Sequence, residues 1–243
     1  MQKIKKIKGL PHSLLSRVII GGSQPRHYHI RFIGKSPSSP DLPEGQVVEC
    51  MIENEFICHS LANIVGVNVP EFFVEKYEGG WYFFSRDIDP RPDSEPNFHY
   101  STNEELAKVD KLEIALVNAF NIWVVNEDII CPGRRNMILA NNKIYMIDFA
   151  NALFGINKDG WKEKFNSARD NKEHARKFFI YEWSSINCLE FEQACEIIKS
   201  INDFTIDSII RKALNIGLIN EEKHSITRDF LIERKGKILE LVR

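Results

Sequence analysis

Residues 114–153 read "IALVNAFNIWVVNEDIICPGRRNMILANNKIYMIDFANAL", and this stretch decides the fold. It begins as an apolar run of helical length, breaks into a polar segment and ends in two short apolar runs. The pair Asn141-Asn142 between these runs favours a tight hairpin turn. Four polar side chains stand where apolar structure stops: Asn126, Asp128, Asn136 and Asp148. The stretch therefore predicts a helix, a loop and a hairpin with polar side chains at the breaks.

Three of these side chains have the chemistry of phosphoryl transfer. Asn136 opens the first strand of the hairpin and Asp148 ends the second, so we expect the two to meet. Their oxygens are the hard ligands that Mg²⁺ prefers, which predicts two metal ligands. Asp128 opens the preceding loop and is predicted to act as catalytic base or to orient an attacking hydroxyl. The alternative is that all three cap helices and start turns, but three such residues around one hairpin favour a site.

Length and composition restrict the class of protein. The chain has 243 residues, of which 43% are hydrophobic and 27% are charged, so one large domain or two lobes sharing a cleft are expected. The formal net charge of -2 gives no sign of nucleic acid as the main partner. The apolar runs are too short to span a membrane and no signal peptide is recognisable, so we expect a cytoplasmic protein. The five cysteines form no CxxC pair, which favours reduced, buried thiols over zinc.

The first part of the chain is predicted to be rich in strands. Residues 16–22 and 26–34 alternate like paired strands, and a helical pattern after them closes at Gly66. A hairpin is expected over residues 69–88, and a proline-rich segment follows at 89–98.

The rest of the chain is predicted to be mainly helical. One long helix is expected over residues 104–125, and further helices lie between residues 191 and 242. Charged side chains on the last helices are expected to be solvated, namely Arg211, Lys212, Arg234 and Lys235. The predicted fold class is α+β, a two-lobed protein-kinase-like fold. Residues 1–92 would form a strand-rich N-lobe that binds nucleotide, and residues 93–243 a helical C-lobe with the catalytic loop and the metal-binding hairpin.

The chain resembles the HipA-like kinases, in particular their short bacterial group. The matching segments are residues 52–76 and 120–154, with weaker matches at 19–34 and 227–239. The most specific block reads Asn-x-Asp, then Asn, a hairpin, and Ile-Asp before Ala-Leu. The resemblance implies ATP and Mg²⁺ as cofactors and transfer of the γ-phosphoryl group to Ser or Thr of a protein. It gives Asp128 the catalytic role and makes Asn136 and Asp148 the metal ligands.

The resemblance also implies residues that bind the nucleotide. Arg31 stands where the family has a strand Lys, and it is expected to pair with Glu55, which matches the family's helix Glu. Lys35 lies four residues on and offers a substitute cation. A glycine turn precedes these residues and is expected to cover the phosphates with N–H groups and a hydroxyl; its members are Gly21, Gly22 and Ser23. Arg134 in the catalytic loop is expected to face phosphates.

Two departures from the family pattern keep alternatives open. The step from Asp128 to Asn136 is eight residues. In the family it is about five to seven residues, which is near the spacing in the catalytic loop of protein kinases. Arg31 also has a wider, planar head than Lys. Both features support a pseudokinase that binds or regulates without transfer. A phosphoinositide or small-molecule kinase is a third interpretation, ranked lower because no membrane-binding patch stands out. By analogy with HipA, a neutralising protein partner and a toxin role are further hypotheses.

Overall fold

The computed structural model describes residues 16–20, 26–33, 52–77, 80–86, 106–126, 136–150, 152–154, 163 and 188–243. The first two of these ranges are described by their backbone alone. The chain divides into two compact units. One unit comprises Met1–Ile52 and Pro70–Ile88, and the other comprises Glu53–Val69 and Asp89–Arg243.

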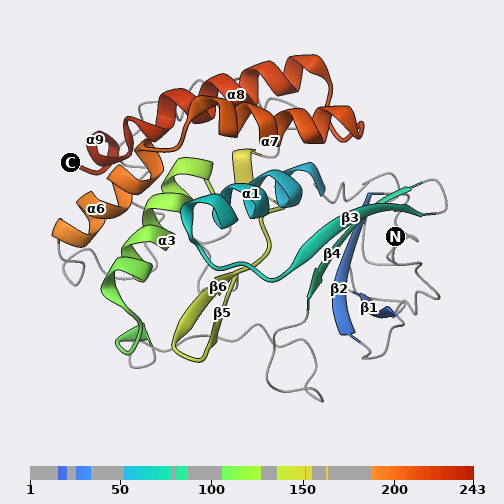
Figure 1. Ribbon diagram of the computed structural model, residues 1–243, viewed down its shortest axis with the longest axis horizontal. Coiled ribbons are helices and arrows are strands. Elements are labelled where there is room, and N and C mark those ends of the chain that lie inside the picture. Colours follow the sequence, from blue (N-terminus) through green and yellow to red (C-terminus); the bar gives the residue numbers. More distant parts are fainter. Residues whose placement is uncertain are drawn as a thin grey trace. The chain divides into compact units, whose positions relative to one another are not determined.

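The first unit contains an antiparallel sheet with the strand order β1-β2-β4-β3 (Figure 1). Its strands are β1 (Ser16–Ile20), β2 (Arg26–Ile33), β3 (Phe72–Tyr77) and β4 (Gly80–Arg86). These confirm the predicted pairing of the first two strands and the predicted second hairpin.

Aromatic pairs hold β3 against β4. Phe73 lies directly opposite Phe84 and stacks on it, with 4.6 Å between ring centroids. Phe72 stacks diagonally on Phe83 at 5.7 Å. Such cross-strand pairs stabilise a hairpin beyond the apolar area that they bury.

Helix α1 (Ile52–Val65) ends as predicted at Gly66, whose φ of +85° is a left-handed conformation that favours glycine. All of α1 after Ile52 belongs to the second compact unit. The sequence placed this helix with the strands in residues 1–92. The difference has a physical cause, because hydrogen bonds from the first turn of α1 reach residues 149–152 of the second unit.

The helix predicted over residues 104–125 starts later than expected. Helix α3 spans Lys111–Val124, and the Asp110 carboxylate caps it by accepting the N–H groups of its second and third residues at 2.9 and 3.2 Å. Leu106 and Val109 are buried in a separate turn just before the cap. Because these apolar residues continue the helical pattern toward the N-terminus, the predicted helix began several residues too early.

Helix α3 is the centre of the second unit. Every residue from Ile114 to Val124 is buried, as expected for a helix enclosed on all sides. It packs against β6 and three C-terminal helices (Figure 1). These three are α6 (Cys188–Lys199), α8 (Glu221–Lys235) and α9 (Ile238–Val242). Helix α7 (Asp203–Asn215) packs against α8. Trp123 ties α3 to α8, because its Nε1 donates a hydrogen bond to the Leu231 carbonyl at 2.8 Å.

The predicted hairpin is confirmed as β5 (Met137–Ala140) paired with β6 (Lys143–Met146). Asn141 and Asn142 form its turn with φ of +54° and +58°. Two consecutive left-handed residues give the turn the twist that the strands require, and Asn adopts this conformation more readily than most residues. A short 3-10 helix follows at Ala152–Phe154.

The expectation that all four charged residues on the last helices are solvated is wrong for two of them. Arg211 and Lys212 are exposed, but Arg234 is only 1% exposed and its Nε donates to the Ile122 carbonyl at 2.8 Å. The side chain of Lys235 is 12% exposed. A charged residue on a helix is normally exposed to solvent, so the sequence predicted exposure for Arg234. Arg234 is buried instead because it bonds a buried carbonyl of helix α3, more than a hundred positions earlier in the chain.

None of the helices in the described part of the chain is long and apolar enough to cross a bilayer. Cys58 and Cys195 are buried free thiols, in agreement with the predicted use of cysteine. Burial, and then the negative charge of Glu55, raises the pKa of Cys58 well above its usual value. Burial is also the main reason why the pKa of Cys195 rises to about 12. Neither thiol has the exposed, electropositive surroundings of a reactive cysteine.

Candidate functional site

The two predicted metal ligands, Asn136 and Asp148, lie together at the open end of the β5–β6 hairpin. Met137 pairs with Met146 as the last register pair, so the residues just beyond it face each other. Ile147 donates its N–H to the Asn136 carbonyl at 3.0 Å. The Asn136 amide nitrogen donates to the Asp148 carbonyl at 3.2 Å. The prediction that these two residues meet follows from antiparallel pairing, and the geometry agrees with it.

The orientation of Asn136 suits a ligand. Its side chain is 4% exposed, and Nδ2 is engaged by the Asp148 backbone. The amide oxygen Oδ1 is therefore the atom that remains for a cation. Asp148 is half-buried, and its carboxylate supplies a second hard oxygen donor of the kind that Mg²⁺ takes. In the described residues no group of three or more His, Cys, Asp or Glu gathers into a metal cluster.

Asp148 adopts a left-handed backbone with φ of +59°. Outside glycine, Asp and Asn reach this region most readily, although it is uncommon for them too. The residue therefore turns the chain sharply between β6 and the buried Phe149.

The first turn of helix α1 holds the segment that follows Asp148. Glu55 is fully buried, and its Oε2 accepts the Phe149 N–H at 2.9 Å. Nδ1 of His59, one turn further on, lies 2.9 Å from the Glu55 carbonyl and 3.4 Å from Oε2. The Asn54 amide nitrogen donates to the carbonyl oxygens of two further residues of the segment, at 2.9 and 2.8 Å.

The Phe149 ring completes the attachment. It is fully buried and packs edge-on against His59, with 5.0 Å between centroids, and against Phe120 of α3 at 5.8 Å. Phe149 is thus held by its backbone from α1 and by its ring from both α1 and α3. Helices α1 and α3 therefore both fix the position of Phe149.

A pair of buried amides precedes the predicted catalytic loop. Asn121 and Asn126 are fully buried, and Nδ2 of Asn126 donates to Oδ1 of Asn121 at 3.1 Å. The Asn126 N–H also bonds the Asn121 carbonyl at 3.0 Å. Val125 between them has φ of +51°, an outlier for a β-branched residue. The chain therefore leaves α3 toward Asp128 through a strained and hydrogen-bonded exit.

Several predicted site residues fall outside the described part of the chain: Gly21, Gly22, Ser23, Lys35, Asp128 and Arg134. Arg31 is described by its backbone, which pairs with Phe83 across β2 and β4. The predicted ion pair between Arg31 and Glu55 stays a prediction, because the Arg31 side chain is not among the described atoms.

The sequence did not identify Asn54 or His59 as part of this site. A signal was present in Glu53-Asn54-Glu55, three polar residues in a row at the start of a mainly apolar helix. Successive helix residues point about 100° apart, so one of the three should face the interior whatever the rotation of the helix. All three are in fact fully buried.

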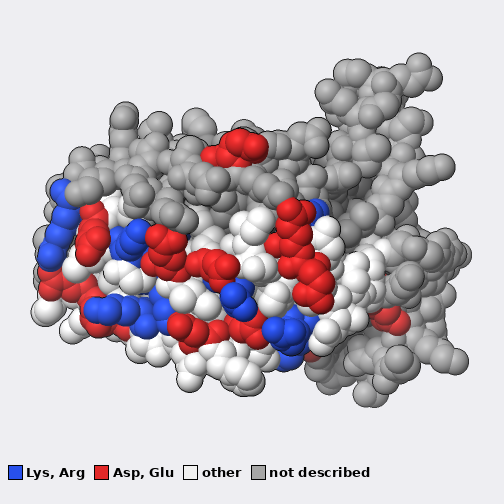
Figure 2. Space-filling model, turned by 90° about the horizontal axis from the view of Figure 1, so that it is seen from above, with Lys and Arg blue, Asp and Glu red and all other residues white. Residues whose placement is uncertain are grey.

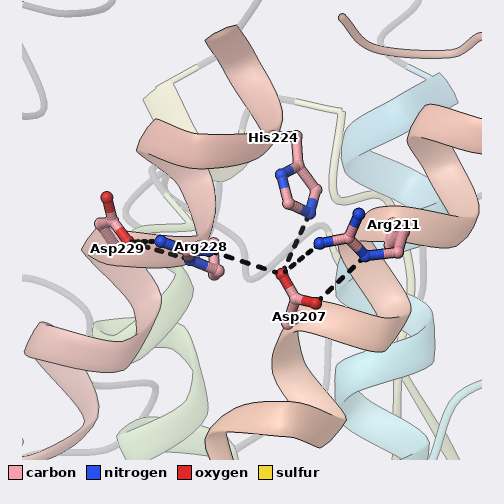
Figure 3. A network of polar contacts seen from close by, with 5 residues as sticks. All are labelled: Asp207, Arg211, His224, Arg228 and Asp229. Carbon is pink, nitrogen blue, oxygen red and sulfur yellow. Dashed lines mark hydrogen bonds and ion pairs between the residues drawn. The ribbon is translucent and has the colours of Figure 1, made fainter. Parts of the chain in front are cut away.

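A second polar cluster joins α7 to α8 (Figure 3). Asp207 accepts from Arg211 at 3.2 Å, and its Oδ1 lies 3.1 Å from Nε2 of His224 and 3.8 Å from Arg228. A hydrogen bond from Arg228 to Asp229, together with the charge of Asp229, raises the pKa of Arg228.

Positive and negative side chains are interleaved on the face of the molecule shown in Figure 2. Because Arg211 and Asp229 are exposed and Arg228 is only half-buried, we interpret the cluster as a weak link between two helices.

Several solved structures are similar to this chain, and two of them illustrate the likeness. The proinflammatory kinase CtkA of Helicobacter pylori has a TM-score of 0.59 and 16% identity, with 98% of this chain and 94% of that chain covered. HipA of Shewanella oneidensis, from a toxin–antitoxin complex with HipB and operator DNA, has a TM-score of 0.52 and 12% identity, with 98% and 67% covered. No family model and no curated protein matches the sequence. At these identities the likeness concerns architecture, and the chain has the fold of the HipA-like kinases.

Proposed function

We propose that the protein is a kinase that uses ATP and Mg²⁺ to transfer a γ-phosphoryl group to a hydroxyl, most specifically to Ser or Thr of a protein. The observation that carries the proposal is the meeting of Asn136 and Asp148 at one end of the β5–β6 hairpin, in a chain with the fold of these kinases. The hydrogen bond joins the Asn136 side chain to the Asp148 backbone, so the two residues lie next to each other.

The chain's own residues would divide the work. The oxygens of Asn136 and Asp148 would hold Mg²⁺, which when bound neutralises charge on the phosphates. Asp128, which follows the Asn121–Asn126 pair, would orient the acceptor hydroxyl and accept its proton. The glycine turn at residues 21–23 would cover the phosphates with backbone N–H groups.

Four further residues would bind the nucleotide. Arg31 would hold the inner phosphates and pair with the buried Glu55 carboxylate, with Lys35 as the substitute cation and Arg134 facing the phosphates from the catalytic loop. A fully buried carboxylate is costly unless it has partners, and the Phe149 N–H already supplies one to Glu55.

Thermal unfolding with and without ATP and Mg²⁺ tests the proposal. Ligand at about 100 times its Kd adds about 2.7 kcal/mol of stability. For a chain of this length that raises the midpoint by about 5–11 °C. Asp148→Asn should lose the part of the shift that depends on Mg²⁺. Asp229→Asn is the matched control, because it removes one carboxylate charge from the exposed cluster on α8.

Transfer of labelled phosphate to protein tests the catalytic role separately. Asp128→Ala should abolish transfer while the ATP-dependent shift stays largely intact, since orienting the hydroxyl is not needed to bind the nucleotide. Transfer by Asp128→Ala at the wild-type rate would contradict that role. No shift of the wild type at millimolar ATP would contradict the kinase and favour a scaffold that lost its nucleotide.

A protein partner is also part of the proposal. HipA belongs to a toxin–antitoxin system with HipB, and a neutralising partner of this chain is proposed on that likeness alone. Co-purification of the full chain with the product of a neighbouring gene, followed by the phosphate-transfer assay, tests it. A partner that binds without reducing transfer would contradict neutralisation.

A further inference from the structure

The first turn of helix α1 is enclosed although it is polar. Glu53, Asn54 and Glu55 are consecutive, and each is fully buried. Buried polar groups in folded proteins have partners in the great majority of cases, because an unsatisfied one is costly. The partners of Asn54 therefore indicate why this turn carries an amide instead of an apolar side chain.

Asn54 bonds two carbonyl groups with one amide nitrogen. Nδ2 lies 2.9 Å from the Ala150 oxygen and 2.8 Å from the Ala152 oxygen. An amide NH₂ has two donors in a fixed planar arrangement, so the two bonds together set the relative positions of the two carbonyls. These carbonyls lie 96 and 98 residues away in sequence, so the contact is tertiary.

The bonded carbonyls belong to the segment that follows Asp148. The neighbouring Glu55 accepts the N–H of Phe149, so α1 holds this segment at three backbone atoms. Asp148, at the start of the segment, has a left-handed backbone that the chain would leave readily if the following residues were loose.

We propose that Asn54 is a positioning residue for the metal-binding end of the hairpin. By fixing the Ala150 and Ala152 carbonyls, it keeps Asp148 in its left-handed conformation with its backbone against Asn136. The inference rests on the proposed function, in which Asp148 binds Mg²⁺. An amide is required because both hydrogens are used, and an aspartate would set its oxygens against two carbonyl oxygens.

The test uses the full chain with Asn54→Asp and Asn54→Ser. Aspartate has nearly the same shape without the two donors, and serine keeps one donor without a charge. Serine serves as the readout if circular dichroism shows that Asn54→Asp does not fold. Ile210→Val is the control, because Ile210 is fully buried in α7 and its truncation also lowers stability.

Two quantities are measured. The first is amide hydrogen exchange in peptides that cover residues 147–153, which should be at least about 10-fold faster in the Asn54 variants. The second is the Mg²⁺ concentration that gives half of the ATP-induced midpoint shift, which should rise at least about 10-fold if the ligand is loosened. Saturating Mg²⁺ should restore much of the shift. Ile210→Val should change neither quantity.

The outcomes separate this inference from the proposed function. Unchanged exchange at residues 147–153 in a folded Asn54 variant would overturn the inference, and so would faster exchange with an unchanged Mg²⁺ requirement. Both failures leave the wild-type response to ATP and Mg²⁺ intact. A wild type that shows no such response would instead refute the proposed function, and the positioning of a metal ligand would fall with it.

Discussion

Replacing Glu55 with glutamine separates the hydrogen bond that this side chain makes from the charge that it carries. Glu55 is fully buried, and its Oε2 lies 2.9 Å from the Phe149 nitrogen. Glutamine has the same length and keeps an oxygen that accepts the N–H. Alanine removes the acceptor altogether. The two substitutions therefore test the structural role and the proposed electrostatic role of one carboxylate.

The expected changes in stability differ in size. A hydrogen bond to a charged group contributes about 1.5–3 kcal/mol and a neutral one about 0.5–1.5 kcal/mol. The lower ends of these ranges differ by about 1 kcal/mol and the upper ends by about 1.5 kcal/mol, so Glu55→Gln should lose about 1–1.5 kcal/mol. Relief of the buried charge acts in the opposite direction. The midpoint should thus fall by no more than about 3–6 °C. Glu55→Ala leaves the Phe149 N–H buried without this acceptor and should cost about 3 kcal/mol, or about 6–12 °C.

For Glu55→Gln, the expected loss of phosphate transfer is large although the expected loss of stability is small. If the Glu55 carboxylate holds a cation beside the nucleotide, glutamine should lower the rate at least about 100-fold, the usual loss on removing one preorganised electrostatic group. Glu113→Gln is the matched control. Like Glu55, it is a carboxylate that accepts a backbone N–H, because its Oε1 accepts the Ile144 N–H at 2.6 Å; Ile144 lies within β6, away from Asp148. It should transfer phosphate at nearly the wild-type rate.

Thermal unfolding and phosphate transfer are measured on the same preparations of all four proteins. A Glu55→Gln rate within about twofold of the Glu113→Gln rate would refute the electrostatic role, since catalytic groups cost far more than that. Glu55→Ala as stable as Glu55→Gln would refute the claim that the Phe149 N–H depends on this acceptor.

Two further predictions concern stability outside the site. Arg234→Met removes the donor to the buried Ile122 carbonyl and should lower the unfolding free energy by about 1–3 kcal/mol, a midpoint loss of about 2–12 °C; a loss no larger than that of the exposed Lys212→Met would contradict the buried hydrogen bond. Asn202→Ala removes the N-cap that accepts the Phe204 N–H at 2.8 Å and should cost about 1 kcal/mol, or about 2–4 °C, with the Mg²⁺-dependent ATP shift unchanged. An Asn202→Ala midpoint equal to wild type would show that water replaces the cap.

The β5–β6 hairpin could be read from the sequence because its determinants are local. Apolar alternation marks the strands, and Asn141-Asn142 marks the turn. Once the turn is placed, antiparallel pairing brings the residue before the first strand to the end of the second. The meeting of Asn136 and Asp148 needed no other information.

The attachment of helix α1 could not be read from the sequence, because its partners are distant. Asn54 bonds carbonyls 96 and 98 residues away. Every residue has a backbone carbonyl, so the sequence does not indicate which one accepts the bond. Arg234 escaped prediction for the same reason, since its acceptor is the Ile122 carbonyl. The late start of α3 was missed because apolar residues continue through the turn before Asp110. Hydrophobic periodicity cannot distinguish a polar side chain that bonds a distant backbone atom from one that is exposed to solvent.

The positions of backbone strain bear on whether Asn136 and Asp148 form a site or only shape turns. Among the described residues other than glycine, five have positive φ, and two of them make the β5–β6 turn. The other three are Val125, Asp148 and Leu153. Val125 stands at the exit from α3 toward Asp128, and Leu153 ends the stretch that Asn54 holds.

A left-handed non-glycine residue costs about 1–3 kcal/mol and persists only where its surroundings over-determine it. Val125 and Leu153 are fully buried. Buried amides hold both places, through Asn121 and Asn126 at the first and Asn54 at the second. Plain caps and turns would be cheaper with Gly or Asn at the strained positions. That the chain instead strains bulky residues on both sides of the predicted catalytic and metal-binding residues favours a preorganised site over the alternative that these residues only terminate secondary structure.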